Sequence, residues 1–214
     1  MLRNSTTRLT KRGAATRRRI IEGAARLILE QGVAGTSLDE VMAETGVSKS
    51  QLYHYFADKD AIVAEVIRLQ VENVLAAQSR ELDVIDSMRS LRHWRDAIVK
   101  LSSVQGTENG CPIGSLASEL TNRSEAARGM LAGGFETWSR RIEAGLKKMR
   151  ERGELAETAD AEELAMAILG AVQGGLLLAK TMRSVRPVEL MLDMALARVE
   201  QHLVAPSAAR RRRK

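Results

Sequence analysis

The chain has 214 residues, of which 44% are apolar and 28% are charged, so it can bury a core in one ordinary domain or two small ones. Its single cysteine, Cys111, excludes a disulfide framework and any zinc or iron–sulfur site that needs several cysteines. Three histidines leave little material for a histidine-based metal site, and we expect neither a metal nor a cofactor.

Positive charge is concentrated at the two ends of the chain. Residues 1–19 carry seven basic side chains and no acidic one, and Arg210–Lys214 add five more. Because the whole chain has a net charge of +6, residues 20–209 have a net charge of −6. Like-charge runs at termini are usually disordered and track phosphate without reading bases. We therefore expect a basic flexible arm over residues 1–19 and a basic tail over 206–214, with simple solubilisation as the alternative.

The sequence gives no strong targeting signal. The N-terminus lacks the apolar stretch of a signal peptide, although its Arg, Ser and Thr content would also suit an organellar transit peptide. The most apolar run, Leu164–Ala179, has 16 residues and includes Gln173, whereas a membrane span needs roughly 20 apolar residues. We expect a buried helix there, no membrane contact and a cytoplasmic protein.

Helical periodicity runs through most of the chain, and strand signals are almost absent, so we predict an all-α fold. Ser37 and Glu40 have the spacing of a capping box, which marks the start of a helix. Four N-terminal helices are predicted: Ile20 to Gly32, Ser37 to Thr45, Lys49–Tyr55 and about Lys59–Ala77. Later helices are predicted at Leu91–Val104, Ser124–Gly153, about 160–183 and about 187–204, with a loop at Gly106–Gly114.

Two short helices joined by a glycine turn, after a longer helix, are typical of a helix-turn-helix unit. The second short helix of such a unit lies in the major groove of DNA. On a helix over 49–56, the inward positions are apolar or aromatic: Leu52, Tyr55 and Phe56, together with Val47 just before it.

The outward face of the same short helix is polar and suits nucleic acid. It carries Ser50, Tyr53 and His54, flanked by Lys49 and Gln51. Glutamine is best suited to adenine, whereas tyrosine, histidine and lysine suit phosphate oxygens. Lys59, just after this helix, is therefore a further candidate for a phosphate contact. The helix starts at Ser37 and Ser48 offer further backbone amides to phosphate.

Several segments resemble the TetR family of bacterial one-component regulators over about residues 14–67: Gly35–Ser37, Val41–Ser50, Leu52–Phe56 and Lys59. The resemblance implies DNA contacts at eight positions: Ser37, Ser48, Lys49, Ser50, Gln51, Tyr53, His54 and Lys59. Two departures affect which side chain meets which base. Ser50 stands where Gly is common, and the aromatic run reads Tyr-His-Tyr-Phe rather than Tyr-Tyr-His-Phe or Tyr-Arg-His-Phe.

The charge balance of the DNA-binding segment bears on specificity. Residues 20–67 contain eight acidic and three basic side chains. Bulk charge therefore opposes DNA binding here, which favours directed, sequence-specific contacts over nonspecific coating. A ligand-independent nucleoid-type protein remains the alternative, and such a protein would bind any duplex with steep salt dependence.

The TetR resemblance implies that residues 68–205 form an all-α C-terminal domain that dimerises and holds a small effector. The last two predicted helices are the most apolar, and pairing them across a twofold axis would make a four-helix bundle. Ala171 and Gly175 would let backbones approach there, although an intramolecular core pair is also possible. The segment Gly110–Glu119 is similar to the LmrA/YxaF-like branch of the family, which is linked with drug-export or small aromatic-compound genes.

The predicted effector is hydrophobic or aromatic, and seven residues on the enclosing elements are candidates for its site: Trp94, Cys111, Ile113, Leu116, Phe135, Trp138 and Gln173. Plain core packing is the competing interpretation for each of them. Cys111 is either a thiol sensor at a helix start or a buried small residue at a loop-to-helix junction.

An enzyme would need Cys111 as nucleophile with His93 or His202 as base, and no catalytic motif supports that arrangement. The sequence therefore predicts a cytoplasmic, homodimeric repressor that leaves a palindromic operator when a small effector binds. Transcriptional activation by the same protein is the other possibility.

Overall fold

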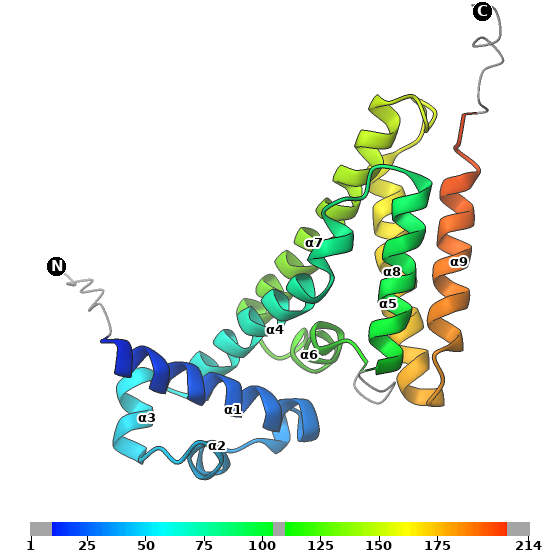
Figure 1. The fold of residues 1–214 in the computed structure, drawn as a ribbon. Coiled ribbons are helices and arrows are strands. Elements are labelled where there is room, and N and C mark those ends of the chain that lie inside the picture. Colours follow the sequence, from blue (N-terminus) through cyan, green and yellow to red (C-terminus); the bar gives the residue numbers. More distant parts are fainter. Residues whose placement is uncertain (1–9, 105–109, 205–214) are drawn as a thin grey trace, which may run out of the picture.

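The computed structural model describes residues 10–104 and 110–204, and within these ranges every regular element is a helix (Figure 1). The helices are α1 (Lys11–Gly35), α2 (Leu38–Thr45), α3 (Lys49–Tyr55), α4 (Lys59–Leu82), α5 (Met88–Val104), α6 (Pro112–Leu120), α7 (Glu125–Glu151), α8 (Ala161–Met182) and α9 (Arg186–Glu200). The predicted all-α fold is confirmed.

The two short helices of the N-terminal part are closed by local hydrogen bonds. Ser37 forms a capping box with Glu40 at the start of α2, and Ser48 forms one with Gln51 at the start of α3. Gly46 ends α2 with φ 63°, a left-handed conformation that glycine adopts without steric cost. These signals lie within a few residues of one another, which explains why the sequence predicts α2 and α3 well.

Several predicted boundaries need correction. Residues 11–19 were expected to be a flexible arm, but α1 begins at Lys11, where the Thr10 hydroxyl accepts a hydrogen bond from the Gly13 amide at 3.1 Å. Gly32, with φ 78° and ψ 169°, breaks α1 as predicted, yet one more turn follows to Gly35. Residues 1–9, residues 106–109 of the predicted 106–114 loop and the basic tail 206–214 lie outside the described residues.

Three other helix ends also differ from the prediction. Helix α4 continues to Leu82, five residues past the predicted end at Ala77. Helix α6 starts at Pro112, inside the predicted loop, and α9 ends at Glu200 rather than near residue 204. The periodic apolar pattern predicts that a helix is present, but it does not determine the residue at which the helix begins or ends.

The long helix α4 connects the two halves of the molecule (Figure 1). Its first half packs on α1, and its second half packs on α5 and α7. The short α6 lies across the junction and contacts α1, α4 and α7. Helices α4 and α6 thus contact both α1 and the helices of the C-terminal half.

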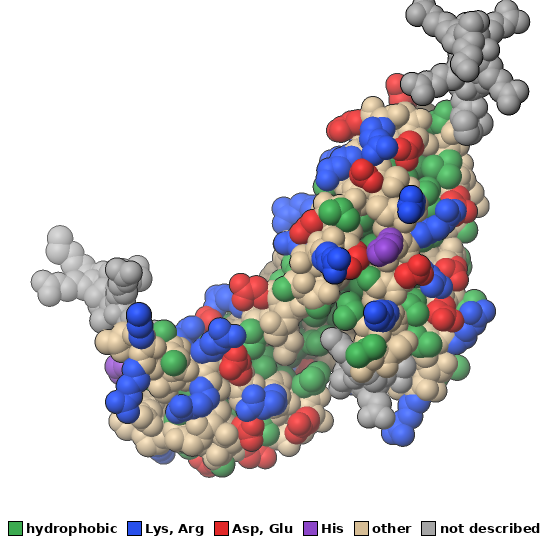
Figure 2. Space-filling view, viewed as in Figure 1, with side chains coloured by type: hydrophobic (Ala, Val, Ile, Leu, Met, Phe, Trp, Pro, Cys, Tyr) green, Lys and Arg blue, Asp and Glu red, His purple; other side chains and the backbone are tan. Residues whose placement is uncertain are grey.

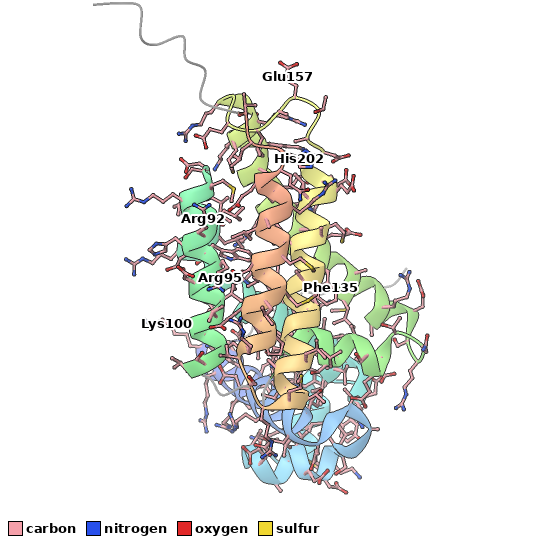
Figure 3. The ribbon with its side chains drawn as sticks, turned by 90° about the vertical axis from the view of Figure 1, so that its right-hand side faces the viewer. Arg92, Arg95, Lys100, Phe135, Glu157 and His202 are labelled. Atoms are coloured by element: carbon pink, nitrogen blue, oxygen red, sulfur yellow. The ribbon has the colours of Figure 1, made fainter. Side chains whose placement is uncertain are left out.

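Helices α8 and α9 pack against each other along their length, and Figure 3 shows them side by side, with α5 next to α9. Gly175 of α8 permits close approach, because a Cβ atom there would lie 2.9 Å from Val188 Cα of α9. Gly175 thus serves a contact within the chain, not the contact between subunits that we predicted for it. Arg92 and Arg95 of α5 add ion pairs to α9, at 2.7 Å to Glu200 and 2.9 Å to Asp193.

Candidate DNA interface and effector cavity

Helix α3 separates an apolar side from a polar side. Leu52 and Phe56 are buried, and Tyr55 is half-buried, so this side anchors α3 to the N-terminal core. The predicted DNA-contacting side chains of α3 and its cap all lie on the exposed side: Ser48, Lys49, Ser50, Gln51, Tyr53 and His54. Tyr53 is 48% exposed, so its phenol is accessible to a partner on this side of α3.

Two predicted DNA contacts are already engaged in local bonds. The Gln51 side-chain oxygen accepts a hydrogen bond from the Ser48 amide at 3.0 Å. The Ser37 hydroxyl donates to a Glu40 carboxylate oxygen at 2.8 Å. A bidentate contact of Gln51 with adenine uses both its oxygen and its nitrogen, so it competes with the capping box.

Lys59 lies apart from the exposed face of α3. Its side chain is half-buried, and its ammonium group donates to the Val33 carbonyl at 2.5 Å. This bond ties the start of α4 to the end of α1. The structure therefore gives Lys59 a partner inside the protein, and a phosphate contact would use the other N–H donors of the ammonium group.

Arg17 has a structural role that the sequence did not indicate. Its guanidinium lies 5.3 Å from the centre of the Phe56 ring and forms an ion pair with Glu65 at 3.0 Å. We had assigned Arg17 to the flexible arm, but it holds α1, the end of α3 and α4 together. The Arg17 guanidinium and the Phe56 ring meet because the end of α3 packs near α1. The sequence pattern contains no signal for this contact between residues far apart in the chain.

Charge is unevenly distributed over the N-terminal part. Figure 2 shows Lys and Arg side chains gathered near the start of α1 and α3, while acidic side chains gather toward α2. Lys11, Arg12, Arg18 and Arg19 are exposed on the first turns of α1. The end of the molecule that carries α3 thus presents a basic surface in spite of the acidic balance of residues 20–67.

A small cavity of about 80 Å³ lies between α4, α5, α6, α7 and α8. Its wall is mostly apolar and contains no charged side chain among the described residues: Val74, Ala77, Gln78, Ile98, Leu101, Ser102, Gly110, Cys111, Pro112, Trp138, Val172 and Leu176. Of the seven predicted effector contacts, Cys111 and Trp138 lie in this wall.

The other predicted effector residues lie elsewhere. Leu116 faces a separate hollow of about 210 Å³ between α1, α4, α6 and α8. Trp94 is fully buried behind the cavity, where its indole N–H donates to Gln78 at 2.9 Å. Ile113, Phe135 and Gln173 line neither space.

The sequence missed the polar members of the cavity wall. Gln78 is 2% exposed and Ser102 is 9% exposed, and each sits in an otherwise apolar helix face. A glutamine at a core position of α4 is the one signal that was available in the sequence. The Trp138 indole N–H is buried without a hydrogen-bond partner among the described residues, which leaves a donor in the cavity wall.

Cys111 caps the N-terminus of α6, and its sulfur accepts a hydrogen bond from the Gly114 amide at 3.5 Å. The side chain is 7% exposed, and burial raises the pKa of the thiol, only partly offset by its hydrogen bonds. The thiol is therefore neutral at physiological pH and a poor nucleophile. This geometry favours the buried-junction interpretation of Cys111 over the thiol sensor.

Helices α8 and α9 share an exposed apolar face, which we call the α8–α9 face. It consists of Met166, Leu177, Leu178, Met182, Leu190 and Met194. Among the described helices, α8 has the length and apolarity to cross a membrane, with 44% of its most apolar window buried. Exposed large apolar side chains on two helices that pack together are typical of an interaction site.

Comparisons with known proteins place both halves of the chain in one family. Residues 20–66 match "Bacterial regulatory proteins, tetR family", and residues 87–195 match "Tetracyclin repressor-like, C-terminal domain". The chain is 25% identical to the transcriptional repressor DhaR of Mycobacterium sp. (strain GP1), over 83% of this chain and 89% of DhaR. It is 27% identical to the regulator LmrA of Bacillus subtilis, over 81% of this chain and 90% of LmrA.

A solved structure shows the same fold over nearly the whole chain. A TetR transcriptional regulator from Chloroflexus aurantiacus superposes with a TM-score of 0.80 at 24% sequence identity, covering 91% of this chain and 98% of that one. The predicted architecture, an N-terminal helix-turn-helix unit followed by a helical C-terminal part, is confirmed.

Proposed function

Because the chain belongs to the TetR family of bacterial transcriptional regulators, we propose that it is a homodimeric repressor that binds a palindromic operator and leaves it when a small molecule binds. The family consists of regulators, so the chain is not an enzyme, and the arrangement of Cys111 with His93 or His202 needs no catalytic interpretation. We assign DNA reading to residues 20–67, and effector binding and dimerisation to residues 68–205, in a cytoplasmic protein.

The observation that carries this proposal is the two-sided character of α3. Buried Leu52 and Phe56 fix the orientation of the helix, so its exposed polar side has one direction in space. A rigidly oriented helix with exposed Gln, Ser and Tyr side chains suits the major groove, where base edges differ in hydrogen-bonding pattern. Sequence-specific binding follows more naturally from this geometry than nonspecific coating.

The α8–α9 face supports dimerisation. Two copies pairing through this face would bury its leucines and methionines in a four-helix bundle. Each dimer then carries two α3 helices related by a twofold axis, and such a dimer matches a palindrome with half-sites about 34 Å apart. A single chain would leave the face exposed to water.

The cavity supports an uncharged, mainly apolar effector. Its wall contains no charged side chain among the described residues, and Gln78, Ser102 and Trp138 provide polar groups. Its volume of about 80 Å³ is far below the roughly 300–1,000 Å³ of typical ligand sites. A ligand larger than a few atoms has to move the surrounding helices apart, so it binds the expanded state better, as a coupled equilibrium requires.

The test is selection of bound duplexes from a random pool with the full-length protein at near-physiological salt. We expect a palindromic motif with half-sites about one helical turn apart. Absence of a motif, with binding that collapses as salt rises, would favour the nucleoid-type alternative. A reporter placed behind the selected site then distinguishes repression from activation by the sign of its response.

Tyr53→Phe is expected to weaken binding to all sequences by a similar factor. The phenol is exposed next to the reading positions, and a hydroxyl bound to phosphate carries no base information. Competition titrations with the selected operator and with single-base variants measure the effect. A large change in base preference would show that Tyr53 reads a base.

Gln51→Ala is expected to relax base preference at one position of each half-site, at a cost of roughly 1–3 kcal/mol. The same change removes the capping box with Ser48, so it also weakens α3. Gln51→Glu is the matched control, because Glu keeps the box but cannot donate to adenine. If both variants select the parental motif, Gln51 does not read a base.

A further inference from the structure

One side chain of the C-terminal half is bonded to the backbone of the N-terminal half. The carboxylate of Glu119, near the end of α6, accepts hydrogen bonds from the Val33 amide at 2.8 Å and the Ala34 amide at 2.6 Å. These two contacts join residues more than eighty positions apart in the sequence. They are charge-assisted, and such bonds are the stronger class of hydrogen bond in proteins.

The break in α1 makes this contact possible. Gly32 has φ 78° and ψ 169°, so the helix stops there and restarts for one turn. The first amides of a restarted turn are not used by the turn itself, and a negative charge near them is favourable. Glu119 thus caps the turn from outside, and a Cβ atom on Gly32 would lie 3.1 Å from its carboxylate oxygen.

The same turn is held from the opposite side and leads directly into the DNA-reading helices. Lys59 at the start of α4 donates to the Val33 carbonyl at 2.5 Å, and the Thr36 hydroxyl donates to the Gly32 carbonyl at 2.8 Å. Ser37, the next residue, caps α2. The turn is therefore the point where α1, α4 and α6 together set the orientation of α2 and α3.

The other end of α6 lies at the cavity. Cys111 caps the first turn of α6, and both Cys111 and Pro112 line the cavity wall. Helix α6 has nine residues and is thus about 13 Å long. One short rigid element connects the space assigned to the effector with the turn that orients the reading helices.

We propose that Glu119 is a positioning residue, whose bonds to the amides of Val33 and Ala34 fix the angle of the reading helices against the dimerising part and thereby the operator half-site spacing. This inference rests on the proposed function. A ligand that expands the cavity displaces α6, and helix shifts of about 1–2 Å are enough to break such bonds. The released reading helices then no longer match the groove spacing.

The first test compares operator spacing for the wild type, Glu119→Gln and Glu119→Ala, using duplex pools in which the selected half-sites are separated by variable spacers. We expect the wild type to enrich one spacing and the variants to keep the half-site bases. The preference for that spacing over spacings one base pair longer or shorter should fall about tenfold in the variants. A merely structural role would lower stability without changing the spacing preference.

Glu125→Gln is the matched control for the loss of one carboxylate. Glu125 is exposed at the start of α7, and its ion pair among the described residues is a local one with Arg128. The Glu125→Gln variant should retain the wild-type preference for one operator half-site spacing. If the wild type selects a palindrome and Glu119→Ala shows the same spacing preference, the positioning role is refuted while the proposed function stands. If the wild type selects no palindrome, the proposed function itself fails.

Amide hydrogen exchange tests the contact without DNA. In Glu119→Ala, the Val33 and Ala34 amides should exchange roughly tenfold faster or more, while amides in the middle of α7 keep their wild-type rates. Unchanged exchange at both amides would show that the contact does not hold the turn in solution, and the inference would be wrong.

Discussion

Met194→Glu is expected to make the protein monomeric and to weaken operator binding roughly a hundredfold or more. Met194 is 61% exposed in the single chain and lies in the α8–α9 face, which dimerisation would bury. A carboxylate buried there without a partner costs several kcal/mol, and the twofold axis places two of them in one interface. A monomer presents one α3 and loses the second half-site.

Sedimentation velocity gives the oligomeric state, and titration of the selected operator and of an isolated half-site gives the two affinities. Val84→Glu is the control, because Val84 is also 61% exposed but lies in the connection between α4 and α5. It should remain dimeric with wild-type affinity. If Met194→Glu stays dimeric, the subunits pair through another surface.

Gly175→Val is expected to lower the free energy of unfolding by about 3 kcal/mol. The new Cβ would lie 2.9 Å from Val188 Cα and 3.4 Å from the Pro187 carbonyl oxygen. Both neighbours are backbone atoms, which cannot rotate away, so α8 and α9 have to separate. Urea unfolding followed by circular dichroism, at one fixed protein concentration, measures the loss.

Gly133→Ala is the control for adding a side chain to a helical glycine. Apart from the nearby backbone of α7 and the adjacent residues, no atom of the described residues lies within 4 Å of the Cβ position at Gly133, so the change should raise the free energy of unfolding by about 0.5–1 kcal/mol. Equal stability of Gly175→Val and the wild type would mean that the two helices pack less closely in solution than in the structure.

The N-terminal helices were predictable because their signals are local. Ser37 and Glu40 are three residues apart, and the capping box that this spacing predicts is present; Ser48 was predicted to start the next helix, which it does, in a box with Gln51. Gly46 supplies the turn between α2 and α3 with its left-handed backbone. Local chemistry of this kind depends little on the rest of the fold, so a single sequence is enough to find it.

The C-terminal cavity was predicted less well because its wall comes from five helices. Cys111 and Trp138 line it, but Phe135, three residues before Trp138, does not. Whether a side chain on α7 faces the cavity depends on how α7 rotates against α4 and α8, which periodicity does not specify. Gln78 was overlooked because a polar residue in a long helix is usually solvent-exposed.

The contact between Glu119 and the Val33 and Ala34 amides could not be predicted from the sequence, for a related reason. Glu119 sits in a short helix with no special spacing to Gly32, and only the packing of α6 on α1 brings their segments together. Gly32 itself was predicted to end a helix, which it does. The break at Gly32 frees the Val33 and Ala34 amides, and their partner, Glu119, lies more than eighty residues further along the chain.

The bond between Gln51 and the Ser48 amide has a consequence for how the operator can diverge over evolutionary time. If Gln51 reads a base as proposed, the same side chain closes the helix and selects the base, so most replacements that change the base preference also loosen α3. Glu preserves the closure, and few other side chains do. A descendant of this protein can therefore change the exposed neighbour Ser50 more readily, and operator drift should concentrate at the base pair that Ser50 would face.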